Sequence, residues 1–324
     1  MRLPTTRRSG VLLAVLVLSA LTGVGAYALT RPPAQVTIGA AGDIACGPDK
    51  PEFASGSPRV CQQQATSDLL VTRHLDAVLP LGDNQYDGGL DAYRRSYGPS
   101  WGRLNALVHP VPGNHEYLYD QARGYWEYFG SAAGEPGKGW YSFDLGRWHL
   151  IALNGTCDRI DCGPHSEEVT WLRRDLARNH RTCVLAYWHY PLFSGGEGAN
   201  EVSEDGARGT PGQANLGDTR VRPLVRALYD AGADVILNGH SHTYERFAPM
   251  RPDGTVDPER GVRQFVVGTG GRSHYVNHAV PGQEVGDDTR FGVLIMTLRP
   301  DGYDWNFVPT TPGGFTDQGS GSCH

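Results

Sequence analysis

The sequence predicts an α/β fold in which two β-sheets pack against each other. In the early part of the chain, short apolar segments typical of strands alternate with segments of helical periodicity. In the late part, apolar segments follow one another with no helix between them. No internal repeat or linker divides the 324 residues, so we expect one domain with a sizeable core.

The elements of the first half follow from these patterns. A short apolar strand is expected at 35–41, and residues 62–74 have apolar side chains at helical spacing (Ala65, Leu69 and Leu70). Two further apolar segments, at 77–81 and 107–112, are expected to be strands. The stretch 117–129 is rich in aromatic residues, which we interpret mainly as packing.

The second half begins with a hairpin, 140–145 and 148–153, that turns at Gly146-Arg147. A helix is expected at 166–179, with Ser166 as its cap. Strand 182–188, helix 219–231 and strand 234–237 follow, and then strands at 262–267, 293–298 and 303–308. Residues 194–218 are rich in Gly and acids without periodicity, which predicts a long surface loop.

The N-terminal segment has the layout of a secretory signal. The first 42 residues contain no Asp or Glu, and three Arg precede the apolar residues 11–21. The small-residue sequence Ala26-Tyr27-Ala28 follows, as at a cleavage site. We predict that residues 1–28 are a signal peptide and that 29–324 form a single domain of a secreted protein. The alternative is an uncleaved membrane anchor, since residues 11–29 are nearly long enough to span a bilayer.

The six Cys residues fit an exported protein, in which an even number predicts disulfides. Short loops favour the pairs Cys46–Cys61 and Cys157–Cys162, which leaves Cys183 for Cys323.

The charge of the chain argues against nucleic acid as the main partner. Removal of residues 1–28 takes away three Arg and no acid, so the net charge of −6 becomes −9. Nucleic-acid binding requires a basic patch, which this composition does not favour.

Polar clusters follow several of the predicted strands. They are Gly42-Asp43, Gly82-Asp83-Asn84-Gln85-Tyr86, Gly113-Asn114-His115-Glu116, Trp188-His189 and Gly239-His240-Ser241-His242. Each alone is weak, because Asp after Gly is commonly a turn former and a lone His at a strand end is commonly a core residue. Together they lie where open α/β sheets bind ligands, at the carboxyl ends of strands. Their carboxylate, phenol, amide and imidazole donors suit two adjacent transition metals, which can clamp the oxygens of a displacement at phosphorus.

These motifs occur in the order found in the calcineurin-like metallophosphoesterases, and the sequence resembles the purple acid phosphatases among them. The resemblance extends from Gly42 to Arg246. Most of the superfamily has a His where this chain has Ala45; here Tyr86 is present instead, which is the purple acid phosphatase arrangement. The resemblance implies a four-layer αββα sandwich, with two packed mixed sheets flanked by helices.

The resemblance also implies the roles of the site residues. One metal ion, Fe(III), would be held by Asp43, Asp83, Tyr86 and His242, and a second, Fe, Zn or Mn, by Asp83, Asn114, His189 and His240. His115 would be the general acid that protonates the leaving oxygen, with Glu116 as its orienter. The implied reaction is in-line attack of a metal-bound hydroxide on a small phosphomonoester.

One departure from the family concerns substrate contact. Small purple acid phosphatases have a substrate-facing His nine residues after the ligand corresponding to His189, and here that position is Gly198. Arg208, in the long loop, is one candidate replacement, but its simpler interpretation is a solvated surface charge. The alternatives in function are a phosphodiesterase on the same scaffold and a non-catalytic metal-binding surface protein. Membrane contact is expected only through an uncleaved N-terminal segment, and the sequence does not predict the oligomeric state.

Overall fold

The computed structural model describes residues 1, 35–55, 59–196 and 217–324. The predicted signal peptide, Gly198, Arg208 and most of the loop 194–218 lie outside the described residues. The chain divides into two units, Met1–Arg31 and Pro32–His324, and all the elements below belong to the second. Among the described residues, none of the helices has the length and apolar character needed to cross a bilayer.

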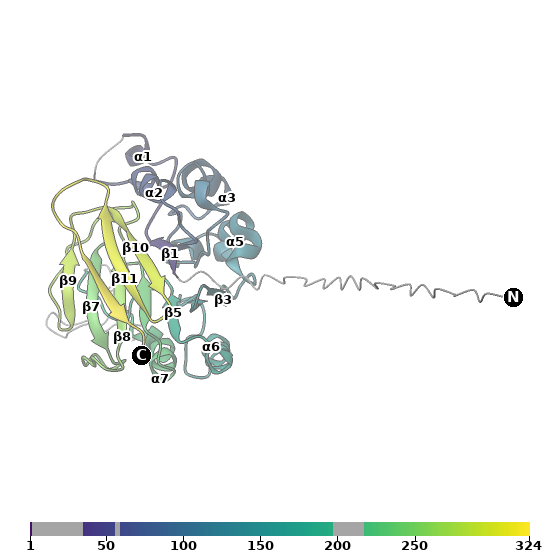
Figure 1. Ribbon diagram of the computed structural model, residues 1–324. Helices are drawn as coiled ribbons and strands as arrows, with labels where there is room; N and C mark the ends of the chain where they lie inside the picture. Colours follow the sequence, from purple (N-terminus) through teal and green to yellow (C-terminus); the bar gives the residue numbers. More distant parts are fainter. Residues whose placement is uncertain (2–34, 56–58, 197–216) are drawn as a thin grey trace. The chain divides into compact units, whose positions relative to one another are not determined.

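Two mixed β-sheets form the centre of this unit (Figure 1). The first sheet has the order β12-β11-β10-β1-β2 and the second the order β3-β4-β5-β6-β8-β7-β9. The first consists of β1 (Val36–Ala41), β2 (Ala77–Pro80), β10 (Gly292–Arg299), β11 (Gly302–Pro309) and β12 (Gln318–Ser322). The second consists of β3 (Tyr141–Leu145), β4 (Trp148–Ala152), β5 (Cys183–Tyr187), β6 (Val235–Asn238), β7 (Tyr244–Met250), β8 (Val262–Val267) and β9 (Gln283–Asp287). Strands β1 and β2 are parallel, as are β4, β5, β6 and β8, and the other pairings are antiparallel.

Helices cover the outer faces of the sheets. In Figure 1, α2 (Gln63–Val71), α3 (Leu90–Ala92) and α5 (Arg123–Phe129) lie near β1, while α6 (Glu167–Arg178) and α7 (Arg222–Asp230) lie near β5 and β8. The short helices α1 (Pro51–Ser55) and α4 (Asn114–Tyr117) and a π-helical turn at Tyr93–Tyr97 complete the layers. Two mixed sheets with helices confirm the predicted fold class.

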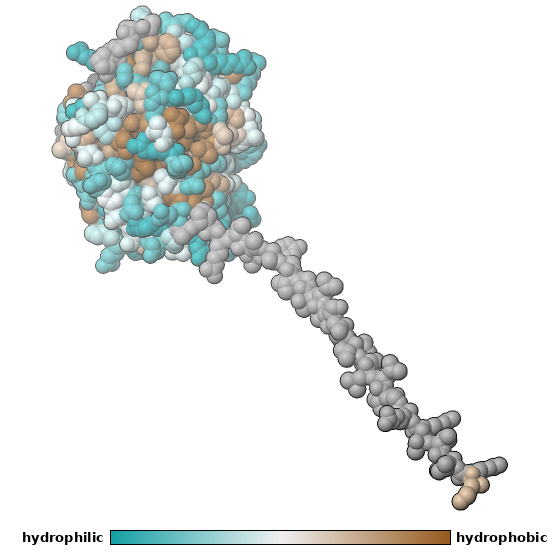
Figure 2. All heavy atoms as spheres, turned by 45° about the horizontal axis from the view of Figure 1, so that its top comes forward, coloured by the Kyte–Doolittle hydropathy of each residue, from teal (hydrophilic) through white to brown (hydrophobic). Residues whose placement is uncertain are grey.

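The alternation of side chains along β5 shows why it is a central strand. Leu185 and Tyr187 are fully buried in the core shared by the two sheets, whereas Val184 and Ala186 are buried in the core under α6 and α7. A strand that is buried on both faces has a continuous run of apolar residues, as β5 has. On the face in Figure 2, hydrophilic residues surround a central group of hydrophobic ones.

Most predicted elements are confirmed within a residue or two, and one is not. The hydroxyl of Ser166 accepts a hydrogen bond from the backbone N–H of Val169 (3.2 Å), so the predicted cap is present. The predicted strand at 107–112 is wrong, since it contributes only isolated bridges, Val78–Val108 and Leu81–Val111. This segment contains Pro110 and Pro112, which have no N–H to donate to a ladder.

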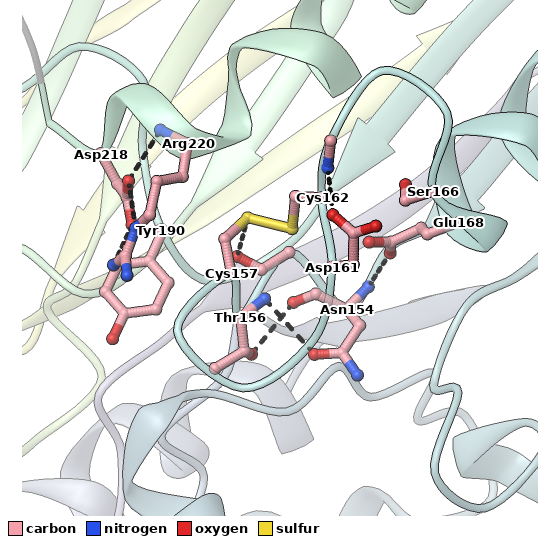
Figure 3. The surroundings of a disulfide bond; sticks show 12 residues. Asn154, Thr156, Cys157, Asp161, Cys162, Ser166, Glu168, Tyr190, Asp218 and Arg220 are labelled. Carbon is pink, nitrogen blue, oxygen red and sulfur yellow. Dashed lines mark hydrogen bonds and ion pairs between the residues drawn. A yellow bond between two sulfur atoms is a disulfide. The ribbon is translucent and has the colours of Figure 1, made fainter. Parts of the chain in front are cut away.

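The three predicted disulfides are all confirmed, and no described cysteine is free. The pair Cys183–Cys323 connects the start of β5 in the second sheet to the residue after β12 in the first. Figure 3 shows the pair Cys157–Cys162, which closes a short loop beyond the end of β4.

Candidate metal centre

Two aspartates lie at the ends of adjacent parallel strands in the first sheet. Asp43 follows β1 and Asp83 follows β2, and the Asp43 N–H donates to the carbonyl of Gly82 (3.1 Å). Both are buried and both have left-handed backbone, with φ of 60° and 47°. Such conformations cost on the order of 1–3 kcal/mol each and cluster at functional sites. They turn both carboxylates out of the sheet at the same edge.

Three histidines approach these aspartates from the second sheet. His189 follows β5, and His240 and His242 follow β6. The Nδ1–H of His189 donates to the carbonyl of Leu81 (2.9 Å), which orients Nε2 toward Asp83 and Asn114. The His240 N–H donates to the Asp43 carboxylate (2.8 Å). The carboxyl ends of the two sheets therefore meet at one place.

Gly239 makes this approach possible. A Cβ at this position would lie 2.8 Å from the Asp43 carboxylate and equally close to the carbonyl of Leu81. The residue that follows, His240, has a φ of 68°, the third non-glycine site residue with left-handed backbone. The Gly239 segment is thus packed closely against the residues that follow β1 and β2.

The first group of donor atoms comes from Asp43, Tyr86 and His242. The Tyr86 hydroxyl lies 3.1 Å from Asp43 Oδ1 and 2.6 Å from His242 Nε2, and His242 Nε2 lies 3.3 Å from Asp43 Oδ1. All three residues are buried. The Nδ1 of His242 is bonded to the Ser273 hydroxyl (2.8 Å), which orients the ring. A phenol, a carboxylate and an imidazole converging in this way suit a hard transition-metal cation.

The second group comes from Asp83, Asn114 and His189. His189 Nε2 lies 3.4 Å from Asp83 Oδ2 and 3.1 Å from Asn114 Oδ1. The ring of His240 lies 5.1 Å from that of His189, centroid to centroid. Ligand atoms of Asp43, Asp83 and His189 all lie within 4.8 Å of one another, which joins the two groups into one cluster. The structure thus brings all seven predicted ligands together.

The electrostatics of the cluster favour cations. Burial alone would raise the pKa of Asp83, but the imidazoles of His189 and His115 lower it below its usual value. Burial would also lower the pKa of His189, but the Asp83 carboxylate outweighs it and raises that pKa to about 9. Burial and the neighbouring His189 lower the pKa of His240 to about 3, so His240 is a neutral donor. An ionised carboxylate and a neutral imidazole are the forms that bind metals, and the donor set fits a pair of transition-metal ions.

His115 lies beside the donors without joining them. Its Nε2 is 3.9 Å from Asp83 Oδ2, its ring packs against that of Tyr86 (centroids 4.1 Å apart), and 31% of its side chain is exposed. Its backbone N–H donates to Asp83 Oδ1 (2.9 Å). An imidazole at the edge of the site, open to solvent, is placed to exchange a proton with a bound molecule.

Glu116 does not orient His115 as expected. It is fully buried, and its carboxylate accepts the backbone N–H groups of Gly113 (2.6 Å), Asp83 (3.0 Å) and Gln85 (3.2 Å). It also accepts the Tyr93 hydroxyl (2.8 Å). The His115 Nδ1 instead lies 3.3 Å from the Tyr86 carbonyl. Glu116 therefore fixes the loops that carry the ligands.

Three residues near the site were not predicted from the sequence. Tyr275 stacks on His242 (centroids 3.9 Å apart, planes 6° apart), and Tyr190 packs against His240 (4.3 Å). Arg272 lies over the ring of Tyr86, with its Cζ 5.0 Å from the centroid. Tyr190 directly follows a predicted ligand, which was a signal for its position; Tyr275 and Arg272 lie in a loop that the sequence did not connect to the site.

A loop beyond β4 (Figure 3) is connected by hydrogen bonds to the helix that carries His115. The Glu168 carboxylate accepts the backbone N–H of Asn154 (2.6 Å), and the Asn154 amide donates to the Tyr117 hydroxyl (2.7 Å). Burial raises the pKa of Glu168 to about 8. Because α4 contains both His115 and Tyr117, this chain of contacts connects the disulfide loop to the segment that follows Asn114.

A profile described as calcineurin-like phosphoesterase matches residues 36–244, which include every residue of the cluster. The chain belongs to this family. It is 26% identical over 256 residues to purple acid phosphatase 22 of Arabidopsis thaliana, covering 70% of this chain and 54% of that protein. It is 27% identical over 192 residues to acid phosphatase type 7 of Homo sapiens, covering 54% and 41%. The chain therefore spans about half, or less, of the length of these relatives. The predicted resemblance to purple acid phosphatases within this family is confirmed.

Solved structures agree on the fold. A purple acid phosphatase from yellow lupin (Lupinus luteus) seeds matches with a TM-score of 0.67 at 16% identity, over 89% of this chain and 54% of that one. GAP50, the anchor in the inner membrane complex of Plasmodium, matches with a TM-score of 0.57 at 14% identity, over 90% of both chains. At these identities the likeness concerns the arrangement of sheets and helices.

Proposed function

We propose that the protein is an exported phosphatase with a binuclear metal centre that hydrolyses small phosphomonoesters. The observation that supports the proposal is the convergence of two donor groups on one buried cluster, in which ligand atoms of Asp43, Asp83 and His189 lie within 4.8 Å of one another. Asp43, Asp83, Tyr86 and His242 would hold a ferric ion, because a phenol favours that hard cation. Asp83, Asn114, His189 and His240 would hold iron, zinc or manganese.

Two bound metal ions would supply an activated water for in-line attack and neutralise charge on the phosphoryl oxygens. The chain's own contribution is to place His115 at the open edge of the cluster, 3.9 Å from Asp83. An imidazole at this position can donate its proton to the leaving oxygen. Export is supported by three disulfides in the described part of the chain, since such bonds persist in oxidising compartments.

Leaving-group dependence tests the role of His115. His115→Ala should keep its metals but lose turnover mainly for an alkyl phosphate, whose leaving oxygen needs the proton, and less for 4-nitrophenyl phosphate. His74→Ala, at an exposed histidine outside the cluster, is the matched control. Equal losses for the two substrates would show that His115 is not the proton donor.

The two alternative functions give different results in the same assay. A phosphodiesterase would hydrolyse bis-(4-nitrophenyl) phosphate faster than 4-nitrophenyl phosphate. A non-catalytic binding protein would bind metal and hydrolyse neither.

A further inference from the structure

Arg272 is fixed to the metal centre through its backbone. It follows β8 through the turn Gly268–Gly271, and its N–H donates to the carbonyl of Asp43 (2.9 Å). Its carbonyl accepts the N–H of Cys61 (3.4 Å), half of the disulfide with Cys46. The next residue, Ser273, holds the ring of His242. The position of Arg272 is thus set by groups that also set two of the predicted ligands.

The guanidinium of Arg272 has no carboxylate partner in the described part of the chain. Its contacts are the face of the Tyr86 ring, 5.0 Å from Cζ to the centroid, and the Cys46 sulfur, 3.8 Å from Nη1. By contrast, Arg246 is paired with Asp317 (2.8 Å) and Arg220 with Asp218 (2.6 Å). A half-buried cation beside the candidate metal centre, most of whose N–H donors have no acceptor among the described residues, is suited to an anion from solution.

His115 and Arg272 both pack against the Tyr86 ring, whose hydroxyl belongs to the first donor group. Two groups that could contact a bound molecule therefore lie against this ring: an imidazole that can donate a proton, and a guanidinium that can pair with negative charge. The planar fork of Arg matches the geometry of two phosphoryl oxygens, which a lysine cannot reproduce.

A simpler interpretation is that Arg272 only covers the Tyr86 ring and the Cys46–Cys61 disulfide. That role requires the stem and the flat head of the side chain but not its hydrogen-bond donors.

We propose that Arg272 binds the phosphoryl oxygens of the substrate held at the metal pair, and so determines phosphate affinity. The inference rests on the proposed function, because the phosphoryl group must be brought there by the metals. It assigns to Arg272 the phosphate contact for which Arg208 is a candidate from the sequence, and it makes oxyanions of phosphate geometry the preferred ligands.

The test is binding of inorganic phosphate to the metal-loaded protein, followed by the change in its visible absorption or by calorimetry. Arg272→Gln removes the charge and the fork, and should weaken phosphate binding about 10-fold to 100-fold, as expected for loss of a charge-assisted hydrogen bond. Arg272→Lys should fall between Gln and the wild type. Arg260→Gln is the matched control, since that Arg also lies over a ring, 5.4 Å from the centroid of Tyr229, but precedes the amino end of β8.

Fluoride binding distinguishes a direct contact between Arg272 and phosphate from an indirect effect of the substitution on the metal ions. This small anion can bind a metal ion without reaching the guanidinium, so its affinity should be unchanged in Arg272→Gln. Equal weakening of fluoride and phosphate, or unchanged phosphate affinity with both metals present, would overturn the inference.

If the Arg272 variants lose their metals, chemical modification of the wild-type protein tests the contact instead. Bound phosphate should slow the reaction of Arg272 with phenylglyoxal in the wild-type protein, measured on the peptide by mass spectrometry, and leave Arg260 as reactive as before. No protection at saturating phosphate would refute the contact. A wild-type protein that binds phosphate tightly but shows no metal-dependent turnover would instead refute the proposed function.

Discussion

Replacing Glu116 tests whether this buried carboxylate holds the ligand loops together. It accepts three backbone N–H groups and one phenol, from Gly113, Asp83, Gln85 and Tyr93, at 2.6 to 3.2 Å. A buried donor left without a partner costs about 1–3 kcal/mol, and water entering the cavity satisfies part of the loss. We therefore expect Glu116→Ala to lower the free energy of unfolding by about 4 kcal/mol, and Glu116→Gln, which keeps the shape, by about 2 kcal/mol.

The measurement is urea unfolding of the metal-free protein, so that loss of bound metal does not add to the change in stability. Glu127→Ala is the control, because among the described residues Glu127 makes only an exposed ion pair with Arg123 (2.7 Å), and its loss should change stability by less than about 1 kcal/mol. The reasoning would be refuted if Glu116→Gln were as stable as the wild type. Normal stability combined with lost turnover would return Glu116 to the role of orienting His115.

Three further predictions concern other parts of the molecule. Gly113→Ala should lower metal affinity, because a Cβ there would lie 2.3 Å from Asp83 Oδ1, and metal content after dialysis measures this. Removing the disulfide Cys183–Cys323 should lower the free energy of unfolding by as much as ~5 kcal/mol, since it closes a loop of 140 residues. Burial opposes protonation of His149, but two aspartate carboxylates, each 2.8 Å from a ring nitrogen, outweigh it and raise its pKa. Its contribution to stability should be fully present below about pH 6.5, the unfolded value, and be lost as pH rises through the raised folded value.

The first two of these predictions have a control in the same chain, and the third is tested by its dependence on pH. Gly89→Ala should keep its metals, because a Cβ there has one neighbour at 3.8 Å. The disulfide Cys157–Cys162 spans 5 residues, and its removal should cost ~2 kcal/mol; a larger cost than for Cys183–Cys323 would contradict the loop-length argument. His149→Asn should show a loss of stability that is larger at pH 5.5 than at pH 9, and a loss independent of pH would contradict the assigned ion pairs.

The sequence was informative where a local pattern decides the structure. The apolar run of β5 and the Ser166 cap of α6 were readable because burial and capping act within a few residues. Strand β7 was missed because it is formed by polar as well as apolar residues, and its place depends on pairing with β8 and β9. The segment 107–112 has an apolar pattern, but its prolines prevent a ladder.

The site shows the same division between local and long-range information. Histidines and aspartates at strand ends were recognisable as ligand types. The left-handed backbone of Asp43, Asp83 and His240 was not, because that conformation depends on contacts between segments far apart in the sequence. Arg272 was missed for the same reason, since only the fold brings its loop against Tyr86.

The central claim is that Asp83 lies between two metal ions, one of which is bound by Tyr86. The most direct measurement is metal content together with the visible spectrum of the purified protein and of Tyr86→Phe. We predict two transition-metal ions per chain, one of them iron, and a phenolate-to-iron charge-transfer band that disappears in Tyr86→Phe. A single metal ion per chain, or a band that persists without the Tyr86 hydroxyl, would contradict the account.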